Sequence, residues 1–295
     1  MSLSALSETA PSNVAARPPL WMVAGFVALL CALFWPSLVE AAGKWKPDTE
    51  YEHAYIVLPA TAFLVWRQRD KLAAAPKSIS WAGLPWIALG CAIQAIAYLV
   101  QIKYVGGWAF PICAAGVILL LFGPAVLRLL AFPLVLPLFV APIPNTILSS
   151  MTLHLQTLTS AASEEVVRYL GYAVVRDGNI ISIPDGSIEV AEACSGLHKS
   201  LAFLAFSALF GYMMELRPLG RLALIALAIP VAMLVNIIRV SSLIAISASF
   251  GNHAFHVVHA PSDIVAVGIG FAIFLGLARL FQCFPQNQRH SPASA

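Results

Sequence analysis

The chain has 295 residues, of which 60% are hydrophobic and 11% charged, and its formal net charge is +3. Soluble domains hold about 45–50% apolar and about 25% charged residues, so this composition excludes an ordinary soluble globular protein. The small net charge gives no reason to expect a nucleic-acid partner. Five cysteines are spread along the chain without the spacing of metal ligands, so we expect no disulfide framework and no metal bound by cysteines. No cofactor is expected either.

Runs of about twenty apolar residues predict helices that cross a bilayer. Eight such segments follow one another, at 20–39, 53–66, 82–102, 106–124, 129–147, 195–214, 221–249 and 262–282. A short loop holding Arg128 is expected to separate the fourth segment from the fifth. The predicted fold class is therefore an all-α polytopic membrane protein with about eight transmembrane helices. Residues 20–282 form the membrane domain, between a disordered cytoplasmic N-terminus (1–19) and a cytoplasmic tail (283–295).

The distribution of basic residues predicts the orientation. With the N-terminus in the cytoplasm, ten Lys and Arg residues fall on inner segments and five on outer segments. Positive charge favours the cytoplasmic side, so both ends are expected there, in the inner (plasma) membrane of a cell.

Residues 146–192 depart from the membrane pattern and are expected to form an extracytoplasmic insertion. Apolar residues at 151, 155, 158, 162, 166 and 170 mark one face of a helix on the membrane surface. The stretch that follows alternates β-branched and polar residues, with turn signals at 177–178 and 185–186. These features predict a three-stranded β-meander that leads to Cys194.

Charged residues inside spans are costly, so each is a candidate for a functional site. Arg239 lies within the seventh segment. It either pairs with a neighbour for structural reasons or provides a fixed cation for an anionic intermediate. Cys194 begins the sixth segment, where a helix N-terminus stabilises a thiolate. Ser195 and Gly196 leave the backbone N–H groups around it open, and such donors hold an oxyanion.

Histidines gather on the same predicted outer side. His253, His256 and His259 follow the seventh segment in an expected loop, with Asp263 close behind, and His53 begins the second segment. Three readings stay open for this loop: a metal site, a histidine that activates a thiolate, or a polar interfacial loop. No HExxH or similar ligand pattern supports the metal site.

The order of these motifs resembles the exosortase/archaeosortase family. The chain has ACSG at 193–196, then N-x-x-R ending at Arg239, then a histidine about twenty residues later. The stretches YEHAYIVLP and PLFVAPIP are also similar to segments of that family. The spacing from Arg239 favours His259 as the family histidine, with His256 as the competing assignment. The family usually has glycine four residues after the histidine, whereas this chain has Asp263.

The resemblance implies a membrane-embedded cysteine transpeptidase. Cys194 would attack a peptide carbonyl in the C-terminal sorting signal of a membrane-anchored protein, and an acceptor would then take the acyl group. His259 would move the proton and Arg239 would stabilise the charge. Asn236, Ser195, Gly196, His53 and His256 are possible supporting residues. The alternatives are a transporter, a polysaccharide-export assembly component without catalysis, and a membrane metallohydrolase.

Overall fold

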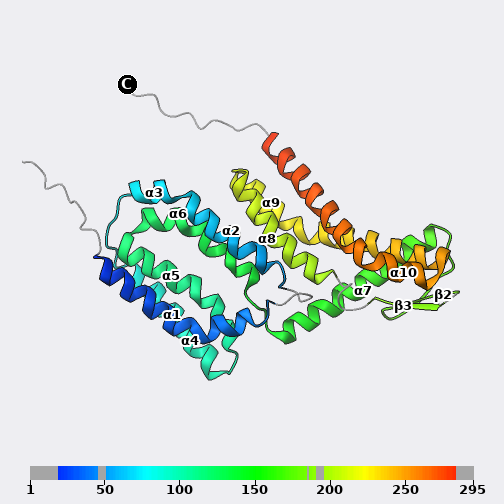
Figure 1. Ribbon diagram of the computed structural model, residues 1–295, viewed down its shortest axis with the longest axis horizontal. Helices are drawn as coiled ribbons and strands as arrows, with labels where there is room; N and C mark the ends of the chain where they lie inside the picture. Colours follow the sequence, from blue (N-terminus) through cyan, green and yellow to red (C-terminus); the bar gives the residue numbers. More distant parts are fainter. Residues whose placement is uncertain (1–18, 46–50, 185, 191–195, 284–295) are drawn as a thin grey trace, which may run out of the picture. The chain divides into compact units, whose positions relative to one another are not determined.

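The computed structural model describes residues 19–45, 51–184, 186–190 and 196–283, which form helices and one small sheet (Figure 1). The α-helices are α1 Leu20–Ala42, α2 Ala54–Arg67, α3 Arg69–Ala74, α4 Gly83–Leu99, α5 Gly106–Phe122, α6 Pro124–Val135, α7 Asn145–Tyr169, α8 Leu197–Met213, α9 Pro218–Ala226 and α10 Ala228–Cys283. Two 3-10 helices, η1 Lys103–Val105 and η2 Leu136–Val140, join neighbouring helices. The chain divides into two compact units, Met1–Glu40 with Ala60–Leu138, and Ala41–Pro59 with Phe139–Ala295.

Within the described residues, three helices are long and apolar enough to cross a membrane. They are Leu20–Ala42, Pro218–Gly251 and His253–Gln282. The pair Pro124–Val140 and Asn145–Tyr169 passes the same test together, but it is bent by 75°. Further apolar helices are shorter, at Ala54–Arg67, Gly83–Leu99, Gly106–Phe122 and Lys199–Met213. The chain is thus a mostly helical membrane protein, and the expected total of eight spans stays a prediction.

In the first unit, α4 and α5 pack closely because glycines line their contact. A Cβ on Gly83 would lie 2.3 Å from the carbonyl oxygen of Gly116, so only glycine fits. The expected loop around Arg128 is wrong, because that residue lies inside α6. The break falls at Gly123, whose positive φ of 85° ends α5, and Pro124 then starts α6. Proline is favoured at a first helical position because its missing N–H is not needed there.

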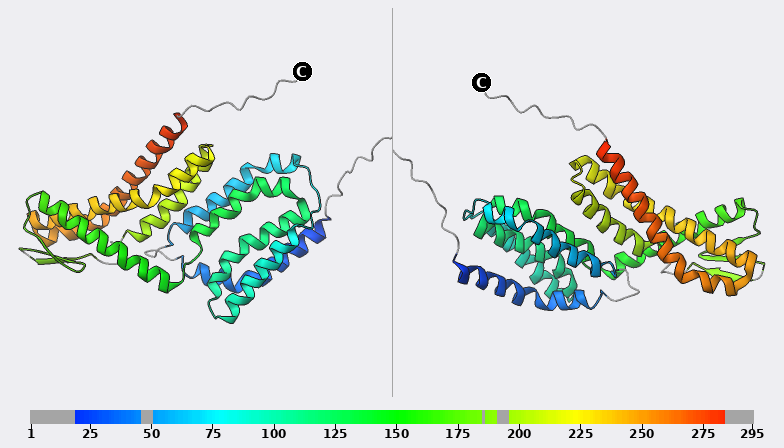
Figure 2. Two further views of the ribbon diagram at one scale, coloured as in Figure 1. Left: turned by 180° about the vertical axis from the view of Figure 1, so that it is seen from behind. Right: turned by 45° about the horizontal axis from the view of Figure 1, so that its top comes forward.

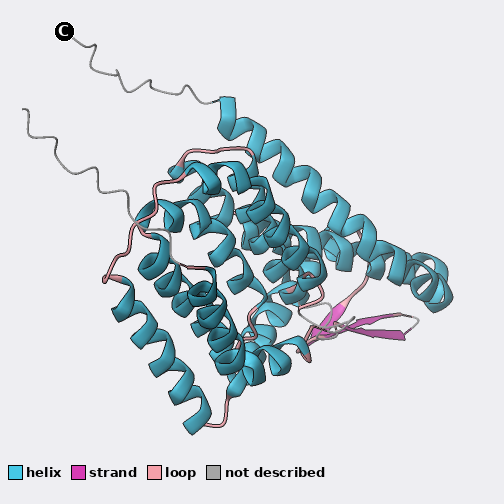
Figure 3. Ribbon diagram, turned by 60° about the vertical axis from the view of Figure 1, so that its left-hand side comes forward, coloured by secondary structure: helices cyan, strands magenta, loops and turns pink. Residues whose placement is uncertain are grey.

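In the second unit, the strands β1 Val175–Asp177, β2 Ile180–Ile183 and β3 Gly186–Glu189 form an antiparallel sheet in the order β1-β2-β3. This is the strand order of the predicted meander, and Figure 3 shows it in magenta as one small sheet in a helical chain. Ile181 of β2 is fully buried and belongs to one apolar cluster with Val240 and Ile244 of α10. The sheet therefore packs against the part of α10 that carries Arg239. Its side of the membrane stays a prediction.

Helix α10 consists of two arms that meet at Gly251. The backbone there is not helical, with φ 81° and ψ 173°, a conformation that side-chain-bearing residues rarely adopt. The first arm runs to Gly251, and the second covers His253–Gln282. The two arms lie side by side as an antiparallel hairpin (Figure 2). The expected loop between the seventh and eighth segments is therefore wrong, because its histidines belong to the second arm. Pro261 lies within that arm and does not end it, since membrane helices tolerate proline.

Candidate functional site

Arg239 lies on the first arm of α10 and reaches across to the second arm. Its Nε–H donates to Ser262 Oγ at 3.0 Å, and the Ser262 hydroxyl donates to the carbonyl oxygen of His259 at 2.6 Å. Its Nη2 also lies 3.5 Å from that carbonyl oxygen. Only 2% of the Arg239 side chain is exposed. The guanidinium is thus held in one orientation by groups on the opposite arm.

Asp263 pairs with two cations, Lys199 and Arg239. One oxygen of its carboxylate lies 2.6 Å from Nζ of Lys199 on α8, and the other lies 3.3 Å from Nη2 of Arg239. The Lys199 side chain is only 8% exposed, whereas that of Asp263 is 51% exposed. A buried cation is costly without a partner, so this carboxylate stabilises both. The ion pairs join the start of α8 to both arms of α10.

The first turn of α8 packs directly on α10 through a glycine. Gly196 precedes Leu197 with a positive φ of 84°, and a Cβ added to it would lie 3.2 Å from Nδ2 of Asn236. Asn236 is one turn before Arg239, is fully buried, and lies 3.5 Å from Thr159 Oγ1 on α7. Gly196 and Asn236 therefore lie in contact, and their supporting role in catalysis stays a prediction. Both residues hold the start of α8 near the Arg239 turn.

The chain is also fixed just before that glycine. The Val190 carbonyl accepts a hydrogen bond from the Gln156 side chain on α7, and the Val190 N–H donates to the carbonyl oxygen of Asn179 at 2.9 Å. Gln156 and Thr159 are three residues apart, hence neighbours on one helix face. The predicted nucleophile Cys194 and the adjacent Ser195 lie outside the described residues, and only their flanks at Val190 and Gly196 are placed.

The candidate histidines occupy different surroundings. His259 is partly buried, and its carbonyl receives the hydrogen bonds from Ser262 and Arg239. His256 is exposed, and its ring contacts that of Phe255 with centroids 5.4 Å apart. His53 is buried, and its Nε2 donates to the carbonyl oxygen of Phe139 at 3.1 Å.

His53 and Lys199 border the same cavity, which has a volume of about 340 Å³. A second cavity, of about 230 Å³, lies between the arms of α10 and includes Arg239 and Ser262 among mostly apolar residues. The ion-paired cluster of Lys199, Asp263 and Arg239 thus borders both cavities, the first through Lys199 and the second through Arg239. No three His, Cys, Asp or Glu side chains within the described part of the chain are grouped as metal ligands would be.

Comparison with known families decides the assignment. The family described as Transmembrane exosortase (Exosortase_EpsH) matches residues 45–276. The chain belongs to the transmembrane exosortase family. No curated protein and no solved structure matches it. The matched region contains α2, the sheet, α8 and the α10 hairpin as far as residue 276.

Sequence reasoning missed the joint role of Lys199, Ser262 and Asp263. Lys199 was not among the predicted site residues, and Asp263 was noted beside the histidines of the expected loop and as a departure from the family pattern. One signal was available. Asp263 is the only Asp or Glu after Glu215 in the sequence, so Arg239 has no other acidic residue within residues 216–295 to pair with.

Proposed function

We propose that this exosortase is a membrane-embedded cysteine transpeptidase that cleaves the C-terminal sorting signals of membrane-anchored exported proteins. Cys194, Arg239 and His259 carry the chemistry. Asn236, Ser195, Gly196 and His53 support it, and His256 is the competing position for the histidine. The enzyme works in the inner membrane, with its site facing the extracytoplasmic side, as the distribution of Lys and Arg predicts.

The reaction proceeds in two acyl transfers. The Cys194 thiolate attacks the scissile carbonyl, the C–N bond breaks, and the leaving amine takes a proton from His259. An acyl-thioester remains on Cys194. A nucleophile on an acceptor then attacks the thioester, its proton passes to His259, and the cysteine is regenerated. Arg239 stabilises the negative charge of each tetrahedral intermediate.

The observation that best supports this proposal is the orientation of Arg239 toward the second arm of α10. Its guanidinium hydrogen-bonds Ser262 and lies against the backbone of His259, so the two proposed catalytic residues meet across the hairpin. Gly196, two residues after Cys194, packs on Asn236, one turn from Arg239. Only Ser195 separates Cys194 from Gly196 in the sequence, so the chain allows the proposed nucleophile to reach both residues.

The decisive experiment is co-expression with a protein that carries a C-terminal sorting signal of the family's kind. Cys194→Ala is expected to leave the amount of enzyme unchanged and to abolish removal of the signal, measured by the mass of the substrate. Cys113→Ala is the matched control, because Cys113 is buried between α1, α4 and α5. Continued processing by Cys194→Ala, or equal loss in Cys113→Ala at normal protein level, contradicts the assignment of Cys194.

A further inference from the structure

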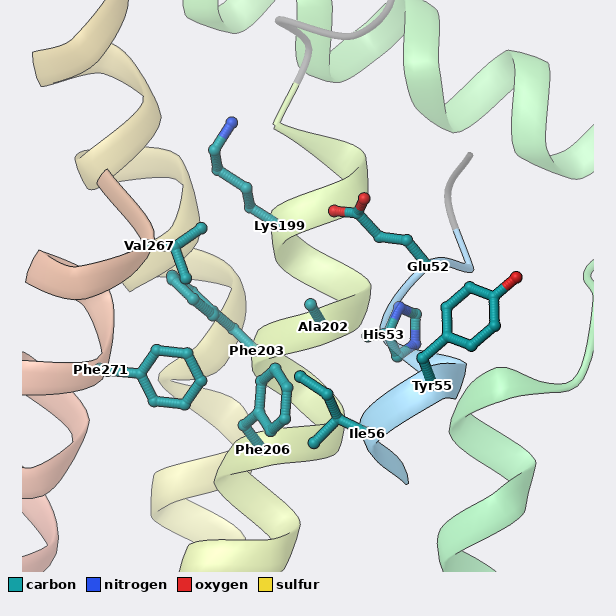
Figure 4. A pocket seen from close by; sticks show the side chains of 10 residues that line it. All are labelled: Glu52, His53, Tyr55, Ile56, Lys199, Ala202, Phe203, Phe206, Val267 and Phe271. Atoms are coloured by element: carbon teal, nitrogen blue, oxygen red, sulfur yellow. The ribbon is translucent and has the colours of Figure 1, made fainter. Parts of the chain in front are cut away.

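The larger cavity in the second unit has two chemically different ends (Figure 4). One end is made by Glu52 and Lys199, whose side chains lie in the upper part of the view in Figure 4, with the Glu52 carboxylate directed toward the side of Lys199. The other end is apolar and aromatic. Its walls come from three segments, namely the start of α2, the first half of α8 and the second arm of α10.

The apolar end is built from phenylalanines that pack on one another. The rings of Phe206 and Phe271 lie 4.8 Å apart, and those of Phe203 and Phe271 lie 6.2 Å apart. Phe203 reaches this position because Gly270 has no side chain, since a Cβ there would lie 2.0 Å from the ring. On the side of α2, Ile56 borders the cavity and is 56% exposed. In a membrane protein, an apolar surface of this kind faces lipid chains.

The polar end of the cavity has one positively and one negatively charged side chain, Lys199 and Glu52. Lys199 has three ammonium N–H donors, and Asp263 is its one ion-pair partner in the described part of the chain. Glu52 is exposed and makes no ion pair with any residue that the structure describes. A ligand with an anionic group beside Lys199 and an N–H cation beside Glu52 matches this end of the cavity.

We propose that this cavity binds one chain of a zwitterionic phospholipid with a primary ammonium head group. The acyl chain lies among Phe203, Phe206 and Phe271, the phosphate accepts hydrogen bonds from Lys199, and the ammonium pairs with Glu52. A protein helix is about 10–12 Å across and does not fit into about 340 Å³. A single acyl chain is much narrower than a helix, and clefts of roughly this size bind small-molecule ligands. The lipid head then lies beside the Lys199–Asp263–Arg239 cluster.

Photocrosslinking of the purified full-length protein in lipid nanodiscs tests this binding. The probe is phosphatidylethanolamine with a diazirine in one acyl chain, in a phosphatidylglycerol background. Phosphatidylcholine and phosphatidylglycerol with the same chain are the comparison probes. Labelled peptides, identified by mass spectrometry, are expected to come from α8 and the second arm of α10. Labelling by the ethanolamine probe should exceed that by either comparison probe roughly tenfold, because a charge-assisted hydrogen bond to Glu52 is available only to it.

Variants separate the two ends of the cavity. Glu52→Gln should remove the preference for the ethanolamine probe while labelling persists, and Glu165→Gln, an exposed carboxylate elsewhere, should not. Val267→Trp should block labelling by filling the apolar end, whereas Val257→Trp, at an exposed position of the same arm, should leave it intact. Labelling should persist in Cys194→Ala, so the binding is measured independently of any peptide chemistry.

Three results overturn the proposal. Equal labelling by all three probes in the wild type rejects the ammonium-specific head site. Unchanged labelling in Val267→Trp rejects the chain site. Displacement of the probe by an excess of a single-span leucine peptide, with no displacement by unlabelled phosphatidylethanolamine, assigns the cavity to a protein segment instead.

Discussion

The ammonium of Lys199 lies 2.6 Å from the carboxylate of Asp263, and this contact joins α8 to the second arm of α10. The same carboxylate pairs with Arg239 on the first arm. Two buried cations therefore depend on one partly exposed anion. Loss of that anion leaves both cations without this partner in an apolar setting, which is more costly than loss of a surface ion pair.

We first predict that Asp263→Asn lowers the free energy of unfolding by about 1–3 kcal/mol, since two charged hydrogen-bond donors lose an anionic acceptor. Asp263→Glu should recover part of the loss because it keeps the charge. Thermal unfolding of the purified variants in one detergent measures the effect. Equal stability of Asp263→Asn and the wild type is the contrary result.

A double-mutant cycle with Lys199→Met isolates the pair. Replacement of both residues should cost less than the sum of the two single changes, because each single change leaves a charged partner behind. Strictly additive losses would mean that Lys199 and Asp263 do not interact. Arg168→Met with Glu165→Gln is a matched exposed pair, and its coupling is expected to be small.

The second prediction concerns the shape of the Arg239 side chain. Arg239→Lys keeps the charge but cannot hold Ser262, the His259 carbonyl and Asp263 at once, because an ammonium is a point charge without the planar fork. Removal of the sorting signal should fall about 100-fold or more, the usual size for loss of an oxyanion-stabilising donor. The rate of signal removal in co-expressing cells measures this.

Arg221→Lys is the control for that substitution. Arg221 lies on α9, and its Nε donates to the carbonyl oxygen of Leu216, away from the hairpin residues that contact Arg239. Its change should leave processing within a few-fold of the wild type. Near-normal turnover by Arg239→Lys would show that any cation at that position suffices.

The third prediction distinguishes the two histidines. His259→Gln should abolish processing, because the residue lies against Arg239 and is proposed to carry the proton. His256→Gln, an exposed residue one turn earlier, should retain most of the activity. Protein levels and unfolding temperatures of the two variants should be similar. If the two activities are reversed, His256 takes the catalytic role.

The fourth prediction tests the hairpin turn. Gly251→Ala forces a side chain into a backbone conformation that favours glycine, at a cost of about 1–3 kcal/mol. Gly268→Ala on the second arm is the matched control, since it lies within a helix and nothing lies within 4 Å of its added Cβ. That change should be neutral or slightly stabilising. Unfolding measurements on both variants give the comparison, and equal stability would mean that the Gly251 turn is not constrained.

Hydrophobic pattern alone was sufficient for most of the helices, because long apolar runs have few other stable structures in a membrane. It was not sufficient for their ends. The residues after the seventh segment, with their three histidines, were expected to form a loop, yet the second arm starts at His253, and the chain breaks at Gly251. Proline in a membrane helix is compatible with continued helix, whereas the φ of Gly251 is not.

The sequence also predicted only some of the side chains of the candidate site. Arg239 stood out from the sequence because a charge inside a span is costly. Its partner Asp263 did not, since their contact depends on how two arms align. That alignment comes from packing between α10, α8 and the sheet, which no local pattern encodes.

In the α10 hairpin, the number of residues between a side chain and Gly251 determines which part of the other arm that side chain faces. Arg239 and Asp263 are each twelve residues from Gly251, since 251 − 239 and 263 − 251 both equal 12. Deletion of a single residue from either arm would swing every side chain beyond it by about 100° around the helix axis and move it about 1.5 Å along that axis. The guanidinium and the carboxylate would then point away from each other with all their chemistry intact. An insertion or deletion in either arm is therefore expected to disrupt the contact between Arg239 and Asp263, whereas most substitutions elsewhere on the arms leave it in place.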